Sequence, residues 1–404
     1  MLESELDLVP PRARLPLRGG ALLPILHGTS GIFIGIGLAR FSFTPVIPLL
    51  IRDGWYTVGE AQLLGAWGLA GYLIGGLAAQ RLARLMPPAL LSALMAGAVA
   101  LSFLIGAIPV SYLVAALWRF VAGFAGAVLM IAGTAEAAAR LAEIGAGRRS
   151  GILFAGVGGG AVVSALLIPV FEAAPVSQIS LALLAIATAS LALHVWAGWN
   201  LPPRLVPRNR RAVPRVGGGT ERALVCIIVA YAMDAAGATP HVVYLVDYAT
   251  REVGMSAASA SFAWAAFGIG ATVGPLILMR LSHRILIPVL LLKSLAVVTV
   301  TLTTWPPAWA ASAFIVGFCT PGIAVLVSSF VQHAAGPASF IRYWALATTA
   351  FAFLQMVAGF LATMLSQATD SYRPVFLLAT GALLVGACAA GLGKRFLNHR
   401  REDD

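Results

Sequence analysis

Charged residues are scarce in this chain. Asp, Glu, Lys and Arg make up 11% of its 404 residues, whereas a soluble domain has roughly 25%. Cysteine is also rare: three occur, at positions 226, 319 and 388. Each lies inside a long apolar segment, so the sequence predicts no disulfide framework. This composition excludes an ordinary soluble protein.

Sequence patterns of catalysis are missing as well. The chain has no Gly-Lys-Ser/Thr phosphate loop, no His-Glu-x-x-His, no Gly-x-Ser-x-Gly and no cluster of metal ligands. We therefore expect a protein that is not an enzyme and that uses no cofactor and no metal. Any energy that it consumes must come from ion or solute gradients.

Long apolar runs fill the sequence instead. Hydrophobic residues make up 59% of the chain, and a helix that crosses a bilayer needs about 20 mostly apolar residues. Twelve such stretches can be placed, with short loops between them, which predicts an all-α membrane protein with twelve transmembrane helices. The stretches cover 21–50, 57–80, 87–109, 111–140, 150–171, 176–200, 222–248, 256–279, 285–304, 307–332, 338–366 and 372–393.

The second six stretches partly repeat the first six, which indicates a duplication. Parallel repeats in a membrane are typical of transporters that bind substrate between the repeats. We predict two pseudo-symmetric six-helix bundles, over 1–200 and 222–404, joined by a basic cytoplasmic linker over 201–221. The matches are Thr44-Pro45 with Thr239-Pro240, 120–124 with 314–318, and Gly71-x-x-x-Gly75 with Gly270-x-x-x-Gly274, at offsets of 195, 194 and 199 residues.

The net charge of +11 does not indicate nucleic-acid binding, because the basic residues follow a membrane topology. With a cytoplasmic N-terminus, all but six of the 27 Lys and Arg fall in cytoplasmic segments. This bias is the positive-inside rule. It predicts a multi-pass protein of the bacterial inner membrane with both termini in the cytoplasm. The Arg-rich segment 204–222 is either a topology anchor or a site for lipid head groups.

Local motifs and the arrangement of six plus six helices resemble the major facilitator superfamily. Arg119-x-x-x-Gly123 on the fourth stretch is similar to motif B of that family. Segment 76–84 resembles motif A, with Gln80 where an Asp is usual. Segments 35–45 and 118–120 resemble the YbfB/YjiJ-type branch. The resemblance implies the fold, transport by alternating access and activity as a monomer, but it implies no substrate.

Two arginines fall near the middle of the predicted membrane. A charge at this depth costs on the order of 2.5–3.5 kcal/mol on insertion scales, so such residues are candidates for function. The guanidinium of Arg40 can hold a carboxylate or phosphate with two hydrogen bonds. We predict that Arg40 binds an anionic substrate and that Arg119 supports the site. The alternative for Arg40 is that it binds carbonyls freed by nearby prolines. For Arg119, the resemblance to motif B implies a proton-coupling or structural role instead of direct binding.

Asp234 also lies at mid-depth, seven residues before His241 and therefore on the same helical face. A carboxylate in a membrane cavity can load and release a proton, and a histidine can relay it. We predict that this pair couples transport to protons. The repeat places Asp234 at the depth of Arg40, so an alternative is that the two neutralise each other. Lys293 either points to the bundle interior or extends to the membrane surface.

Four further residues are predicted to line the cavity and bind substrate: Tyr231, Tyr343, Trp344 and Gln355. The alternative for the aromatic residues is packing. The function predicted from the sequence is a proton-coupled carrier of a small organic anion. An exporter of hydrophobic or cationic compounds is the second hypothesis, favoured by the midplane carboxylate and the aromatic residues. A membrane sensor or scaffold that moves nothing is the third.

Overall fold

The computed structural model describes residues 20–171, 173–202 and 217–403, in which all regular structure is helical. Within these ranges, twelve helices are long and apolar enough to cross a membrane. The predicted fold class is therefore confirmed. Of the predicted linker, residues 203–216 lie outside the described residues, and the division of the chain into bundles at 200 and 222 stays a prediction.

The first six spans contain the elements α1 to α8, and three of them include a π-helical or 3₁₀ segment next to an α-helix. The first span is α1 (Leu22–Ile32), η1 (Phe33–Phe41) and α2 (Phe43–Arg52); the next are α3 (Val58–Leu85) and α4 (Pro88–Ile105); the fourth is α5 (Tyr112–Val128), η2 (Leu129–Gly133) and α6 (Thr134–Glu143); the fifth is η3 (Gly147–Phe154) and α7 (Ala155–Val170); and the sixth is α8 (Val176–Trp199).

The second six spans follow the same plan, and α12 holds two of them. The chain turns at Gly336, where φ is 69°, a value that favours glycine. The spans are α9 (Gly218–Asp247) with η4 (Tyr248–Glu252), α10 (Ala257–Leu278), η5 (His283–Ile285) with α11 (Leu286–Leu302), the two parts of α12 (Pro306–Thr369), and α13 (Arg373–Asp403).

Glycines bring paired helices into backbone contact at the same places in both halves. A Cβ on Gly71 would lie 1.9 Å from the carbonyl oxygen of Phe120, and one on Gly270 would lie 2.2 Å from that of Phe314. Small residues allow such close helix packing in membranes. The two glycine motifs that repeat in the sequence therefore pack against the two repeated aromatic segments, α3 on α5 and α10 on α12.

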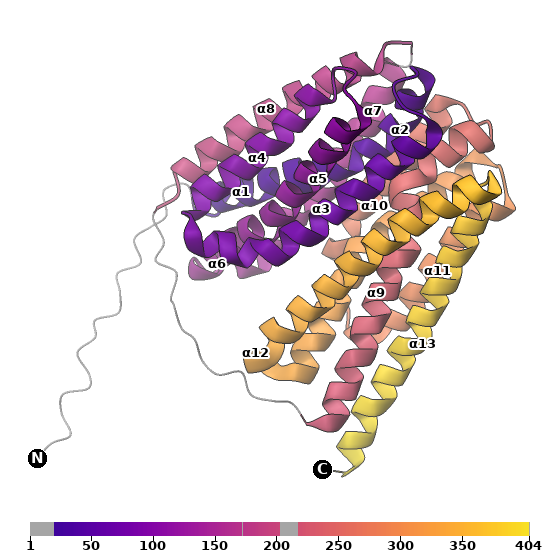
Figure 1. The fold of residues 1–404 in the computed structure, drawn as a ribbon. Helices are drawn as coiled ribbons and strands as arrows, with labels where there is room; N and C mark the ends of the chain where they lie inside the picture. The colour runs from indigo at the N-terminus through magenta and orange to yellow at the C-terminus, as the bar shows by residue number, and fades with distance from the viewer. Residues whose placement is uncertain (1–19, 172, 203–216, 404) are drawn as a thin grey trace, which may run out of the picture.

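The two sets of helices meet at one end of the molecule and separate at the other (Figure 1). The separated end carries Pro202 and Gly217, where the described chain stops and resumes, and we call it the linker end. The opposite end carries the loops around Asp53 and Ser371, and we call it the far end. The arrangement places any space between the halves toward the linker end.

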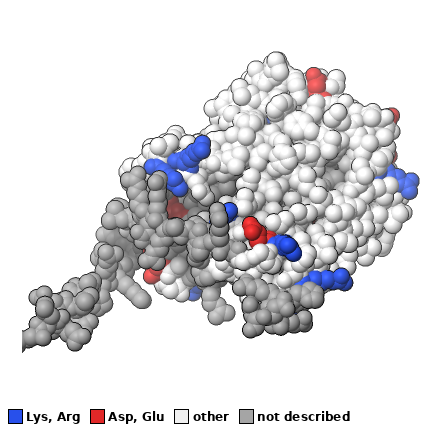
Figure 2. Space-filling view, turned by 60° about the horizontal axis from the view of Figure 1, so that its bottom comes forward, with Lys and Arg blue, Asp and Glu red and all other residues white. Residues whose placement is uncertain are grey.

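Apolar side chains cover the outside of the bundles. Leu113, Leu166, Leu295 and Leu378 are each more than 60% exposed, at 77%, 63%, 63% and 67%. Figure 2 shows the charged side chains as small separate groups on an otherwise uncharged surface. Such a surface suits lipid chains rather than water.

The close glycine contacts make a testable prediction about stability. Gly123→Ala should destabilise the protein by about 1–3 kcal/mol, because the added Cβ would lie 1.9 Å from the carbonyl oxygen of Gly68. Gly97→Ala is the matched control, since a Cβ there has nothing within 4 Å. Thermal unfolding in detergent measures both. Equal midpoints for the two variants would contradict the predicted contact.

Candidate functional site

A central cavity of about 540 Å³ lies between the two halves. The first half contributes Tyr72 from α3, Met130 from η2 and Phe154 from η3, and the second half contributes Tyr231 from α9 and Trp344 from α12. None of the described residues that line the cavity is charged. A cavity shared by both repeats is the expected place for a transported molecule.

Hydrogen bonds between the halves close the far end. The Gln62 amide of α3 donates to the Tyr372 hydroxyl, which donates to the Asp247 carboxylate. The Ser366 hydroxyl donates to the Gln62 carbonyl oxygen at 3.1 Å. The Thr44 hydroxyl donates to the backbone carbonyl of Val242. These bonds hold α2 and α3 against α9, α12 and the start of α13.

Close packing completes the closure. A Cβ on Gly158 of α7 would lie 2.0 Å from the carbonyl oxygen of Gly268 on α10. Beside this contact, the Trp264 indole donates to the Ser164 hydroxyl at 3.2 Å. The Phe41 ring packs edge-on against both Trp264 and Phe267, with centroids 6.1 Å and 5.3 Å apart. These contacts close the far end of the cavity in this conformation.

Arg40 lies in the π-helical segment η1 of the first span. Pro45 and Pro48 cannot donate a backbone hydrogen bond to the preceding turn, which accounts for a widened helix just before them. The Arg40 guanidinium carbon is 5.5 Å from the ring centres of Phe41 and Tyr72. Its buried Nε has no hydrogen-bond partner. Segments of π-helix are frequent at functional sites.

Arg119 supports this segment from α5. Its guanidinium donates to the carbonyl oxygen of Ala39 at 2.9 Å, one residue from Arg40, and lies 3.8 Å from the centre of the Phe43 ring. Arg40 and Arg119 both line a pocket of about 20 Å³ whose wall also includes Tyr72. Among the described residues, no carboxylate lies within ion-pair distance of either guanidinium.

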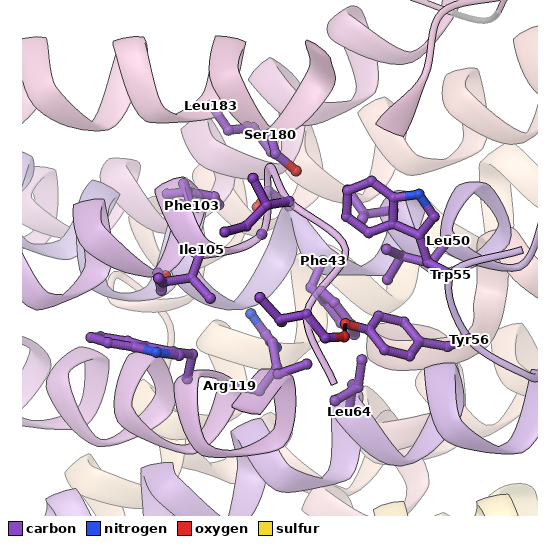
Figure 3. Close-up of a pocket in the computed structure, with 18 residues that line it drawn as sticks. Phe43, Leu50, Trp55, Tyr56, Leu64, Phe103, Ile105, Arg119, Ser180 and Leu183 are labelled. Atoms are coloured by element: carbon purple, nitrogen blue, oxygen red, sulfur yellow. Dashed lines mark hydrogen bonds between the residues drawn. The ribbon is translucent and has the colours of Figure 1, made fainter. Parts of the chain in front are cut away.

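Arg119 also borders a second pocket, of about 70 Å³, inside the first bundle near the far end. Figure 3 shows its labelled walls, with Trp55 and Tyr56 on one side, Phe103 and Ile105 on the other, and the Arg119 side chain pointing into the space. The Tyr56 hydroxyl is already used, because it donates to the carbonyl of Val110 at 2.9 Å. Ser42, Ser102 and Ser180 also line this pocket, and Arg119 is the one charged residue among its described lining residues.

Asp234 forms an ion pair with Lys293 of α11. The Nζ–Oδ1 distance is 2.7 Å, and both side chains are 0% exposed. The partner of Asp234 is thus Lys293 rather than Arg40, and Lys293 points to the interior of the second half. A buried pair of this kind is neutral as a unit. The second carboxylate oxygen, Oδ2, has no hydrogen-bond partner.

His241 lies about two helical turns after Asp234 along α9. Its Nε2 is 2.9 Å from the Ser312 hydroxyl, which donates to the carbonyl of Ala296 at 2.5 Å. The ring packs edge-on against Phe376, with centroids 5.1 Å apart. His241 is 0% exposed and, like Asp234, is not part of the cavity lining. The two residues share a polar cluster inside the second half.

A protein-family model described as an uncharacterised MFS-type transporter YbfB matches residues 32–391. The chain belongs to this family. No curated protein matches it. Family membership confirms the resemblance drawn from the motifs and makes the chain a membrane transporter of the major facilitator type, with twelve helices as the structure has them.

In this MFS-type transporter, two of the four predicted lining residues reach the cavity. Tyr231 and Trp344 both line it, with ring centroids 5.9 Å apart. Tyr343 and Gln355 are buried outside the lining, at 5% and 1% exposure. Both polar atoms of the Gln355 amide lack hydrogen-bond partners. Gln355 lies on α12 between Phe351 of the cavity wall and Gly359, whose carbonyl accepts from Tyr244 near the far end.

The sequence interpretation missed Tyr72 and Phe351 as lining residues. Tyr72 directly follows the first glycine of the repeated Gly71-x-x-x-Gly75 motif, and the close contact at Gly71 fixes the face on which Tyr72 points. Phe351 packs on Tyr231 with ring centroids 4.5 Å apart. The glycine spacing alone was a signal for Tyr72, whereas nothing in the sequence around Phe351 distinguishes it from a packing aromatic.

The Asp234–Lys293 pair predicts a coupled effect on stability. Asp234→Asn and Lys293→Gln should each cost about 3–5 kcal/mol, because either leaves one buried charge without its partner. The double variant should cost clearly less than the sum, since it buries no charge. Unfolding in detergent of wild type, both single variants and the double variant measures this coupling. Simple additivity would show that the two charges do not stabilise each other.

Proposed function

We propose that this transporter is a proton-coupled carrier of a small organic anion. The observation that carries the proposal is that the buried arginines lack an acidic partner, whereas the buried carboxylate has a basic one. The guanidiniums of Arg40 and Arg119 have no carboxylate near them among the described residues, whereas the carboxylate of Asp234 already has Lys293. A buried cation without a counter-ion is unfavourable. An anionic substrate would supply the missing charge.

Arg40 binds the acid group in this proposal, and Arg119 positions Arg40. The bond from Arg119 to the Ala39 carbonyl holds the π-helical segment in place. Tyr231, Trp344, Tyr343 and Gln355 are proposed to contact the substrate. Tyr231 and Trp344 do so from the cavity wall. Gln355, with its unpaired amide, and Tyr343 would act when the helices that carry them rearrange.

Proton coupling is assigned to Asp234 with His241. Protonation of Asp234 would remove the carboxylate that neutralises Lys293 at 2.7 Å. The buried ammonium would then need another partner, so proton binding and a rearrangement of α9 against α11 are linked. The unpaired Oδ2 of Asp234 and the unpaired Nδ1 of His241 are the atoms available to accept a proton in that cluster.

Membrane orientation follows from the charges at the two ends. Pro202 and Gly217 at the linker end flank an Arg-rich stretch of the sequence, so we assign this end to the cytoplasm. The structure then corresponds to a carrier that is open to the cytoplasm and closed outside. We propose that the protein works as a monomer in the bacterial inner membrane, with N- and C-termini cytoplasmic.

A second candidate function is export of hydrophobic or cationic compounds. The observation that favours it is the uncharged, aromatic lining formed by Tyr72, Tyr231 and Trp344, because aromatic faces bind cations. The paired state of Asp234 weighs against it, since the carboxylate that would hold a cation is already neutralised. The two functions differ in how binding depends on Arg40.

Arg40→Gln tests the anion proposal. Loss of a charge-assisted hydrogen bond worth about 1.5–3 kcal/mol should weaken binding of organic anions roughly 10- to 150-fold. Ligand-induced shifts of the thermal unfolding midpoint in detergent report this binding. Arg81→Gln, at an exposed position of α3, is the control and should bind normally. A cationic or neutral ligand that binds wild type and Arg40→Gln equally well would favour the exporter instead.

Neutralising the buried pair tests proton coupling. In proteoliposomes, Asp234→Asn/Lys293→Gln should still exchange labelled for unlabelled substrate but should no longer accumulate it in response to a pH gradient. The double variant buries no unpaired charge, so its loss of accumulation would not reflect misfolding. Glu221→Gln, an exposed carboxylate on the same helix, is the control. Normal accumulation by the double variant would remove Asp234 from the coupling mechanism.

A further inference from the structure

The central cavity has an aromatic wall and lies beside a small pocket that Arg40 and Arg119 line. We infer that the substrate is an organic monoanion with a flat apolar body, such as an aromatic monocarboxylate. This inference rests on the proposed anion carrier and narrows its substrate class. It assigns the body of the substrate to the large cavity and its acid group to the end of that cavity formed by Tyr72.

The second half supplies a stacked aromatic wall. The Tyr231 ring lies 4.5 Å from Phe351 at 33° and 5.9 Å from Trp344 at 20°, and Trp344 in turn stacks on Phe340 with centroids 6.3 Å apart. Tyr231, Trp344 and Phe351 all line the cavity. Rings stacked on one another offer their edges and any uncovered face to the cavity, and a flat aromatic group packs on them edge-on or offset, with a geometry that aliphatic chains do not require.

The first half supplies the charge through Tyr72. Its ring is part of the wall of the large cavity and of the small pocket that Arg40 and Arg119 line. The Arg40 guanidinium lies 5.5 Å from the Tyr72 ring centre. A ligand in the large cavity therefore comes closest to the arginines beside Tyr72. The Tyr72 hydroxyl can donate a hydrogen bond to an acid group.

The sizes of the two spaces limit the number of acid groups to one. The pocket between the arginines holds about 20 Å³, and a single water requires roughly 10–15 Å³. That space fits one small polar group, while the cavity of about 540 Å³ holds the remainder of the ligand. A second acid group would lie against uncharged walls, where an unpaired charge is strongly unfavourable.

Other substrate classes fit this lining less well. A sugar would place many of its hydroxyls against the rings of Tyr231, Trp344 and Phe351, where a polar group without a hydrogen bond is unfavourable. Acetate would leave most of the aromatic wall without contacts. A dicarboxylate would bring a second charge. The walls therefore favour an apolar body with a single acid group.

The test is a ligand panel on purified wild-type protein in detergent, read by shifts of the unfolding midpoint and by calorimetry. The panel contains benzoate, phenylacetate, acetate, succinate, neutral benzamide and benzyltrimethylammonium. Phenylacetate or benzoate should bind at least about tenfold more tightly than acetate, succinate or benzamide, a difference of about 1.4 kcal/mol. Phe351→Ala should weaken the aromatic acids and leave acetate unchanged, whereas Phe262→Ala, 67% exposed on the outside of α10, should change neither.

The possible results separate failure of the inferred substrate class from failure of the proposed anion carrier. Arg40-dependent binding of acetate or succinate as tight as that of the aromatic acids would overturn the inference and leave the anion carrier standing. Tighter binding of benzamide or benzyltrimethylammonium, unchanged in Arg40→Gln, would overturn both. Absence of any aromatic-acid binding at millimolar concentration also overturns the inference. The wild-type panel decides these cases without a variant that folds poorly.

Discussion

Charge neutralisation inside a lipid bilayer is the constraint on which this structure depends. An unpaired charge inside the bilayer costs several kcal/mol. The chain stabilises its buried charges in two different ways. Lys293 and Asp234 neutralise each other at 2.7 Å within the second half. Arg40 and Arg119 rely on aromatic rings and one carbonyl within the first half. The first half therefore keeps a net positive charge beside the cavity, and the second half keeps none.

The two halves are joined by contacts of opposite character. Gly158 and Gly268 bring α7 and α10 into backbone contact, because small residues allow helices to approach closely. Gln62, Tyr372 and Asp247 form a hydrogen-bonded chain that closes the far end. Polar bonds of this kind can be exchanged for bonds to water when the far end opens. The far end is thus closed by one close backbone contact and one chain of polar bonds.

Much of the fold was predictable because depth and periodicity are local properties. Apolar run length located the twelve spans. The repeated glycine and phenylalanine segments indicated a duplication, and the structure adds that they pack on each other, α3 on α5 and α10 on α12. For the site, the charged residues at mid-depth were identified, and Tyr231 and Trp344 do reach the cavity. Helix ends were less accurate: α9 begins at Gly218, not at 222, because glycines and polar residues at its start give no apolar signal.

What the sequence determined by itself is therefore the number of spans and their helical, membrane-spanning character. Only the tertiary structure decided which charge neutralises which. The sequence repeat predicts matching depth for Asp234 and Arg40, yet Asp234 pairs with Lys293, 59 residues away on α11. The reason is that a sequence fixes how far along its axis a side chain lies, whereas its partner depends on the rotation of the helix and on its neighbours. The rotation of α9 likewise directs the His241 side chain into the interior of the second half. The rotations of α3 and α12 place Tyr72 and Phe351 in the cavity wall.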